Sequence, residues 1–65
     1  MDESIEYEVW KEDYLTGLKN LMFTQPELGL AKIIVKDMKE TAEAARAYDR
    51  RYFLVEVTKT RREIE

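Results

Sequence analysis

Residues 24–48 constrain the fold most strongly, because they divide into an apolar face and a charged face when they are wound as an α-helix. A strand would need strict alternation, which the run Ile33, Ile34 and Val35 breaks. The pattern therefore predicts one amphipathic helix over residues 26–48 that covers an apolar surface. Its apolar face comprises Leu30, Ala31, Ile34, Val35, Met38, Ala42, Ala45 and Tyr48, and its charged face comprises Lys32, Lys36, Lys39, Glu40, Glu43 and Arg46.

The start of this helix is predicted at Thr24, whose hydroxyl can cap free amides. Pro26 suits a first helical turn, and Glu27 stands at the capping-box position. The helix is expected to end at Asp49 and Arg50. A second interpretation stays open, in which residues 32–36 are a buried strand and a short helix follows, giving β-α-β-α-β.

Two strands are predicted before the helix. Residues 5–11 alternate, with Tyr7 and Val9 on one face and Trp10 on the other. Gly17 tolerates the positive φ that a hairpin loop needs. Residues 18–23 are then a second strand, although their spacing also suits a short helix.

Residues 52–60 are rich in β-branched and aromatic side chains and predict the last strand. We expect Phe53, Val55 and Val57 to face the helix, and Tyr52 and Leu54 to face away from it. Residues 1–4 and 62–65 are expected to be frayed ends of a single small domain. The predicted fold is a two-layer α+β domain, β-β-α-β, with a three-stranded antiparallel sheet of order 2-1-3 and one helix on one face.

This arrangement resembles a group of known proteins. The first strand has Tyr-x-Val, the turn has Asp-x-x-Thr-Gly, Phe23 and Thr24 precede the capped helix, and the chain closes with Tyr-Phe-Leu-Val-Glu-Val-Thr. Together they are similar in layout to short β-β-α-β proteins of bacteriophages and other mobile elements. The resemblance implies binding to a host protein or to nucleic acid, and it supplies no site residue.

Composition narrows the possible functions. A 65-residue chain buries only roughly 60% of its unfolded surface, and the absence of Cys and His removes disulfides and imidazole or thiolate metal sites. Self-association, as in a dimer, remains a means of stabilisation. No long apolar run is present, so we expect a cytoplasmic protein without a membrane span.

Catalytic chemistry is not expected either. The chain has one serine, Ser4, and no glycine-rich phosphate loop. We expect no enzyme, no cofactor, no metal and no small-molecule substrate, because so few residues rarely enclose a ligand-sized pocket.

A protein-binding module is the leading interpretation, with a larger protein or a second copy as partner. Trp10, Tyr52 and Leu54 are predicted to form an apolar patch on the uncovered sheet face. Ile33 and Ala44 at the helix flank either widen the core contact or touch a partner. The predicted polar rim of the patch consists of Glu6, Glu8 and Glu56.

Nucleic-acid binding through the basic end of the chain is the alternative. Carboxylates expected on the same sheet face as Trp10 oppose it, and the cations can instead pair with the acidic first strand. A third interpretation, an acidic mimic of DNA, depends on the acids of residues 2–13. The residues of the basic alternative are Arg50, Arg51, Lys59, Arg61 and Arg62.

Overall fold

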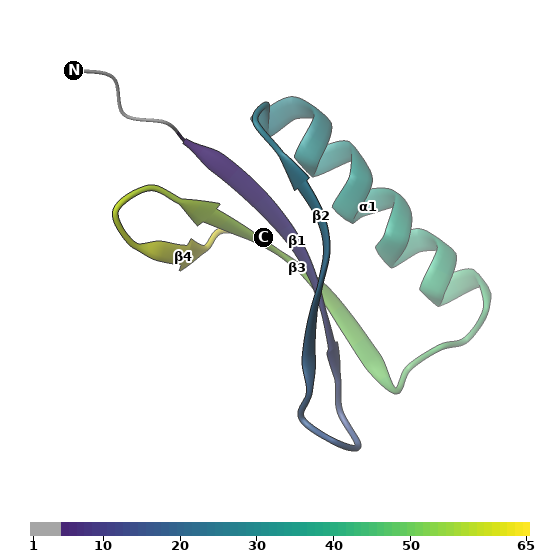
Figure 1. Ribbon diagram of the computed structural model, residues 1–65. Helices are drawn as coiled ribbons and strands as arrows, with labels where there is room; N and C mark the ends of the chain where they lie inside the picture. The colour runs from purple at the N-terminus through teal and green to yellow at the C-terminus, as the bar shows by residue number, and fades with distance from the viewer. Residues whose placement is uncertain (1–4) are drawn as a thin grey trace.

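The fold is a small α+β domain with one helix on one face of an antiparallel sheet, as predicted (Figure 1). The computed structural model describes residues 5–65. The sheet has four strands in the order β2-β1-β3-β4, so the three-stranded prediction was incomplete. The elements are β1 (Glu6–Asp13), β2 (Lys19–Gln25), α1 (Leu28–Ala44), β3 (Arg50–Val57) and β4 (Arg61–Glu63).

The β1–β2 hairpin confirms the strand interpretation of residues 18–23. Gly17 has φ +73°, the left-handed conformation expected of it. The Asp13 carboxylate accepts hydrogen bonds from the backbone N–H groups of Leu15 at 2.8 Å and Thr16 at 3.4 Å, which shapes the turn.

A β-bulge interrupts the pairing of β2 with β1. Val9 lies opposite Phe23, whereas the next residue of β1, Trp10, lies opposite Leu21, so Met22 is the extra residue. A shift of one residue exchanges the two faces of a strand. Phe23 therefore shares the helix-covered face with Val9, and Leu21 shares the opposite face with Trp10.

The helix starts later than predicted. Glu27 is the N-cap residue, without a side-chain capping hydrogen bond, and its carbonyl accepts the N–H of Ala31 at 3.1 Å. The predicted cap, Thr24, lies in β2 opposite Glu8 because the strand continues to Gln25. The predicted capping role of Thr24 was wrong. The β-α-β-α-β alternative was also wrong, since residues 32–36 are helical.

The helix ends at Ala44, before the predicted Tyr48, in a Schellman motif. The N–H of Ala47 donates to the Ala42 carbonyl at 2.8 Å, and that of Arg46 donates to the Glu43 carbonyl at 3.0 Å. Arg46 supplies the left-handed residue that the motif requires, with φ 57°. The chain then turns back into β3.

The core lies between α1 and the two central strands. Tyr7 and Val9 face the helix, as predicted, and pack with Ala31 and Val35. The assignment of the two faces of β3 was wrong: Leu54 is fully buried in this core and Tyr52 packs against it. The register explains the reversal, because Leu54 lies opposite Val9 and Phe53 lies opposite Trp10.

The end of the chain is ordered, contrary to the predicted fraying of residues 62–65. β4 pairs with β3, and Ile64 packs against the core. Beyond β4, the N–H of Ile64 donates to the Leu54 carbonyl at 2.8 Å and the Leu54 N–H donates to the Glu65 carbonyl at 2.7 Å. The predicted frayed residues 1–4 lie outside the described residues.

The domain is elongated. Its Cα radius of gyration is 12.5 Å, whereas a compact domain of this length has a value of about 11 Å. Figure 1 shows α1 along one side of the sheet. A single helix of about 10 Å diameter covers about two strands spaced roughly 4.8 Å apart, so part of a four-stranded sheet is left bare.

Candidate functional site

The structure separates the residues of the predicted Trp10 patch. Trp10 lies on the face away from the helix, as expected, and is half-buried. Tyr52 and Leu54 lie on the helix-covered face, and Leu54 has no exposed surface. The predicted rim is also divided, because Glu56 lies opposite Tyr7 on the helix side. These residues do not form one surface.

Charged side chains cover the sheet face that carries Trp10. Glu8 is buried there and its Oε1 accepts a hydrogen bond from the Trp10 indole N–H at 3.0 Å and one from Arg61 Nε at 3.3 Å. The Arg51 guanidinium lies over the Phe53 ring, 4.4 Å from its centroid. An arginine layer therefore occupies the area where an apolar patch was predicted.

Arg51 is the centre of that layer. Its Nε donates to Glu12 at 2.8 Å, and its terminal nitrogens donate to the two oxygens of Glu63 at 3.0 and 3.1 Å. The hydrogen bonds to Glu63 and Glu12 raise the pKa of the Arg51 guanidinium. The reciprocal hydrogen bond lowers the pKa of the Glu63 carboxyl. The charges are satisfied within the chain.

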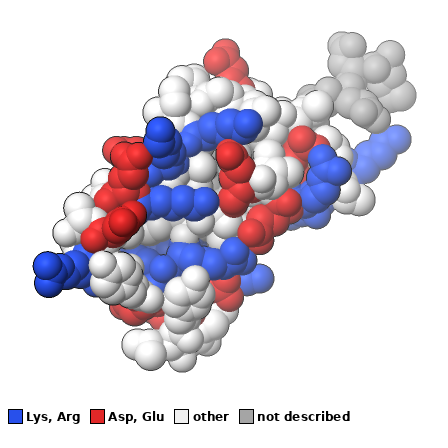
Figure 2. Space-filling view, turned by 180° about the vertical axis from the view of Figure 1, so that it is seen from behind, with Lys and Arg blue, Asp and Glu red and all other residues white. Residues whose placement is uncertain are grey.

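The other residues of the basic alternative are also engaged. Arg50 pairs with Asp49 at 3.0 Å, and that hydrogen bond lowers the pKa of the Asp49 carboxyl. Arg62 pairs with Glu56 at 3.3 Å, and Lys59 also makes an interaction. Figure 2 shows basic and acidic side chains intermixed across the face seen from behind. Phosphate would have to compete with these carboxylates for each paired cation.

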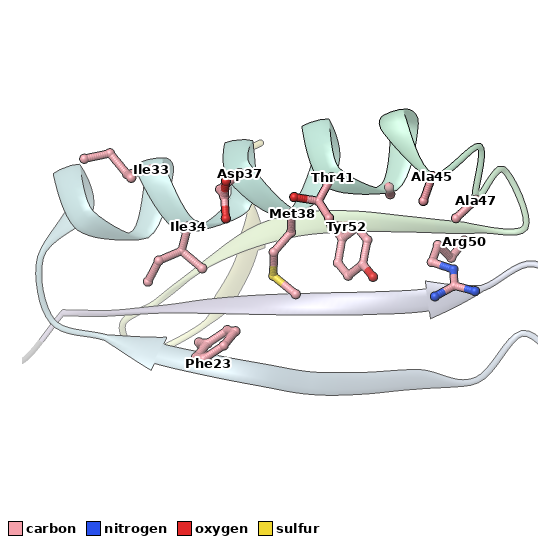
Figure 3. A pocket seen from close by; sticks show the side chains of 11 residues that line it. Phe23, Ile33, Ile34, Asp37, Met38, Thr41, Ala45, Ala47, Arg50 and Tyr52 are labelled. Atoms are coloured by element: carbon pink, nitrogen blue, oxygen red, sulfur yellow. The ribbon is translucent and has the colours of Figure 1, made fainter.

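An apolar groove lies between α1 and β2 (Figure 3). Its volume is about 580 Å³. Phe23 of β2 and Tyr52 of β3 contribute from the sheet, and α1 contributes the opposite wall from Ile33 onward. The lining residues are Phe23, Ile33, Ile34, Asp37, Met38, Thr41, Ala42, Ala45, Ala47, Arg50 and Tyr52.

The position of α1 creates this groove. The core contacts of the helix are with β1 and β3, through Val9 and Leu54. The seven residues of β2 are exposed except for half-buried Gln25, although three consecutive side chains are large and apolar. Those three are Leu21, Met22 and Phe23, which are 47%, 40% and 48% exposed.

The helix flank beside the groove is also apolar. Ile33 is 64% exposed and Leu30 is 46% exposed, so neither is used by the core of the chain. Further along the same flank the side chains are small, namely Thr41, Ala44 and Ala45. The groove is therefore walled by bulky residues near the start of α1 and by small residues near its end.

Two charged residues line the groove, and they differ in their pairing. Arg50 is neutralised by Asp49. The Asp37 side chain makes no hydrogen bond or ion pair within residues 5–65, and it is exposed at the groove wall. The uncompensated charge of the groove is therefore negative.

Sequence reasoning placed Ile33 and Ala44 at the helix flank but did not identify the groove. The available signal was the width of the apolar arc: Leu30, Ile33 and Ala44 extend it beyond what two central strands can cover. A second hollow of about 430 Å³ lies beside Tyr14, Tyr48 and Arg51, near the hairpin loop. It shares Ala42, Ala47, Arg50 and Tyr52 with the groove.

The described residues contain no cluster of three or more acidic side chains suited to a metal ion. Within residues 5–65 no helix has the length and apolar character needed to cross a membrane. Comparison of the chain with protein-family models, with curated proteins and with solved structures finds no match.

Proposed function

We propose that this chain is a non-enzymatic protein-binding module that engages its partner through the α1–β2 surface, defined by Phe23, Leu30 and Ile33. The observation that carries the proposal is the exposure of these three large apolar side chains, of which Phe23 and Ile33 line the same groove. Contiguous apolar surface of this kind is typical of protein interfaces.

The small size of the buried core also supports a partner on this surface. Seven apolar side chains are buried within residues 5–65, namely Tyr7, Val9, Ala31, Val35, Phe53, Leu54 and Val55. Covering further apolar side chains contributes roughly 25 cal/mol per Å² before the costs of association. A partner on the α1–β2 surface would therefore supplement a small core.

The partner surface differs from the one expected from the sequence. Trp10 contributes to a face whose cations and carboxylates satisfy one another, which leaves little for a partner to gain. The groove instead offers apolar walls with one unpaired charge. The layout resemblance extends the proposal to a mobile-element accessory whose partner is a host protein.

Two matched variants test the function. Ile33→Glu places a charge on the exposed α1–β2 surface, whereas Lys36→Gln makes the same charge change at a residue outside the groove lining. Molar mass in solution reports self-association, and affinity capture from a host lysate reports other partners.

We expect Ile33→Glu to lose the complex and Lys36→Gln to keep it, with both variants folded by circular dichroism. A complex that both variants retain would assign binding to another surface. A wild-type chain that stays monomeric and captures nothing would overturn the proposed function.

A further inference from the structure

The α1–β2 groove has the dimensions of a helix-binding site. Its lining residues on the helix side run from Ile33 on α1 to Ala45, the C-cap residue of α1, a length of about 18 Å at 1.5 Å per residue. Packed helices lie about 8–10 Å apart, which is about two strand spacings. Because α1 rests on β1 and β3, a second helix beside it would lie over β2.

An extended peptide fits this side less well. Strand addition needs a regular row of outward N–H and C=O groups along the edge. The bulge at Met22 breaks that row in the middle of β2. Side chains of a helix require no such row, because a helix satisfies its own backbone hydrogen bonds.

The walls of the groove specify which side chains the incoming helix presents. Thr41, Ala42 and Ala45 are small residues that line the groove near the end of α1 and leave room there. Bulky apolar residues would fill that space, as ridges of one helix fill grooves of another. Such residues of the incoming helix would also cover Phe23 and Ile33, whose side chains are 48% and 64% exposed.

The charge of the groove indicates which polar residue the incoming helix carries. Asp37 is the lining residue whose charge is not compensated within residues 5–65. Resting on the proposed protein-binding function, we propose that the groove binds an amphipathic helix of a partner protein, with bulky apolar side chains in the groove and a Lys or Arg directed at Asp37. The cation sets the position of the helix along the groove.

The test uses two synthetic 15-residue helical peptides with leucine along one face. They differ at one central position of that face, which is Lys in one peptide and Glu in the other. Titration of the ¹⁵N-labelled full chain is followed by NMR. We expect the Lys peptide to shift the amides of Phe23, Ile33 and Thr41 and to bind about two- to tenfold more tightly than the Glu peptide, the range for one exposed charge pair made and one repulsion avoided.

Charge reversal makes the test specific. Asp37→Lys should reverse the order, so that the Glu peptide binds more tightly. Glu40→Lys is the matched control, because it makes the same charge change on the same helix at an exposed residue outside the groove lining. It should preserve the order. Thr41→Leu, which fills the groove from within, should weaken both peptides.

Several results would overturn the inference. These are shifts confined to residues around Trp10, a preference that survives Asp37→Lys, or no shifts with either peptide at millimolar concentration. A wild-type dimer held through Ile33 would make a second copy the occupant, which removes the helix inference and leaves the proposed function intact. If Ile33→Glu also keeps every captured partner, both fail.

Discussion

The guanidinium of Arg51 and the carboxylate of Glu63 form a paired hydrogen bond, at 3.0 and 3.1 Å, that joins β3 to the short strand β4. Beyond Glu63, Ile64 packs on the core and bonds to Leu54. A surface ion pair thus secures an apolar contact at the end of the chain.

Acid should loosen β4 first. The pKa of Glu63 is lowered in the folded state by its hydrogen bond to Arg51, so the pair stabilises β4 above the unfolded pKa. That stability is lost as the pH falls below about 4.3, the ordinary Glu value, and through the lowered one. The protection factor of the Ile64 amide, which corrects for the slower intrinsic exchange in acid, should begin to fall below about pH 4.3, before that of Val9. Glu63→Gln should show fast exchange at pH 6 already, and equal exchange in variant and wild type would contradict the role of the pair.

Leu54→Ala should cost about 2–5 kcal/mol of unfolding free energy, because the side chain is fully buried opposite Val9. Leu15→Ala is the matched control, since Leu15 is 85% exposed in the hairpin loop, and it should change stability by about 0.5 kcal/mol or less. Urea unfolding followed by circular dichroism measures both. A small effect at Leu54 would place β3 with its other face on the helix.

Arg46→Gly should stabilise the fold by about 0.5–1 kcal/mol, because Arg46 has φ 57° and glycine adopts that conformation without a Cβ penalty. Ala44→Gly, two residues earlier and still helical, should instead destabilise by about 1 kcal/mol. Opposite signs from the same type of substitution are the diagnostic outcome in thermal unfolding. A destabilised Arg46→Gly would mean that the arginine side chain contributes more than the backbone strain.

Glu27→Ser should stabilise α1 by about 0.5–1 kcal/mol, because the N-cap residue has an extended backbone and no side-chain cap. Thr24→Ala, in contrast, should cost only a few tenths of a kcal/mol, since Thr24 is an exposed residue of β2. The denaturant midpoints of the two variants distinguish a helix that begins at Glu27 from one that begins at Thr24. If Thr24→Ala lowered the unfolding free energy by more than about 1 kcal/mol, Thr24 would be the helix cap after all.

Thr41→Leu should stabilise the isolated chain by up to about 1 kcal/mol, because leucine has the higher helix propensity and would place apolar surface in the groove. Glu40→Leu, at the neighbouring exposed position outside the groove lining, should change stability by about 0.5 kcal/mol or less. Equal effects would show that Thr41 does not face an unfilled space.

The spacing of apolar residues and the turn residues predicted the helix and the first three strands, but they did not predict which face of β3 packs against the helix. In β1, Tyr7 and Val9 lie on one face and glutamates flank Trp10 on the other, so the sequence indicated which face packs against the helix. In β3 both faces are apolar, and the helix side depends on which residue lies opposite Val9. That register is a long-range property, because it is set between strands separated by the whole of α1.

β4 and the α1–β2 groove were missed for a related reason. Arg61, Arg62 and Glu63 have little strand character of their own, and their pairing with β3 is accompanied by two long-range contacts, the docking of Ile64 on the core and the Arg51–Glu63 pair. The groove follows from where α1 sits across the sheet, which no residue specifies locally. Trp10 was correctly placed away from the helix, but its neighbours Glu8 and Arg61 come from opposite ends of the chain.

The bulge at Met22 has a consequence for how the chain behaves at high concentration. β2 is apolar, exposed and seven residues long, and such edges recruit further strands and lead to fibrils when their amides are evenly spaced. The extra residue disrupts that spacing. Side chains of β2 can thus stay available to another molecule while its backbone does not serve as a template for polymerisation.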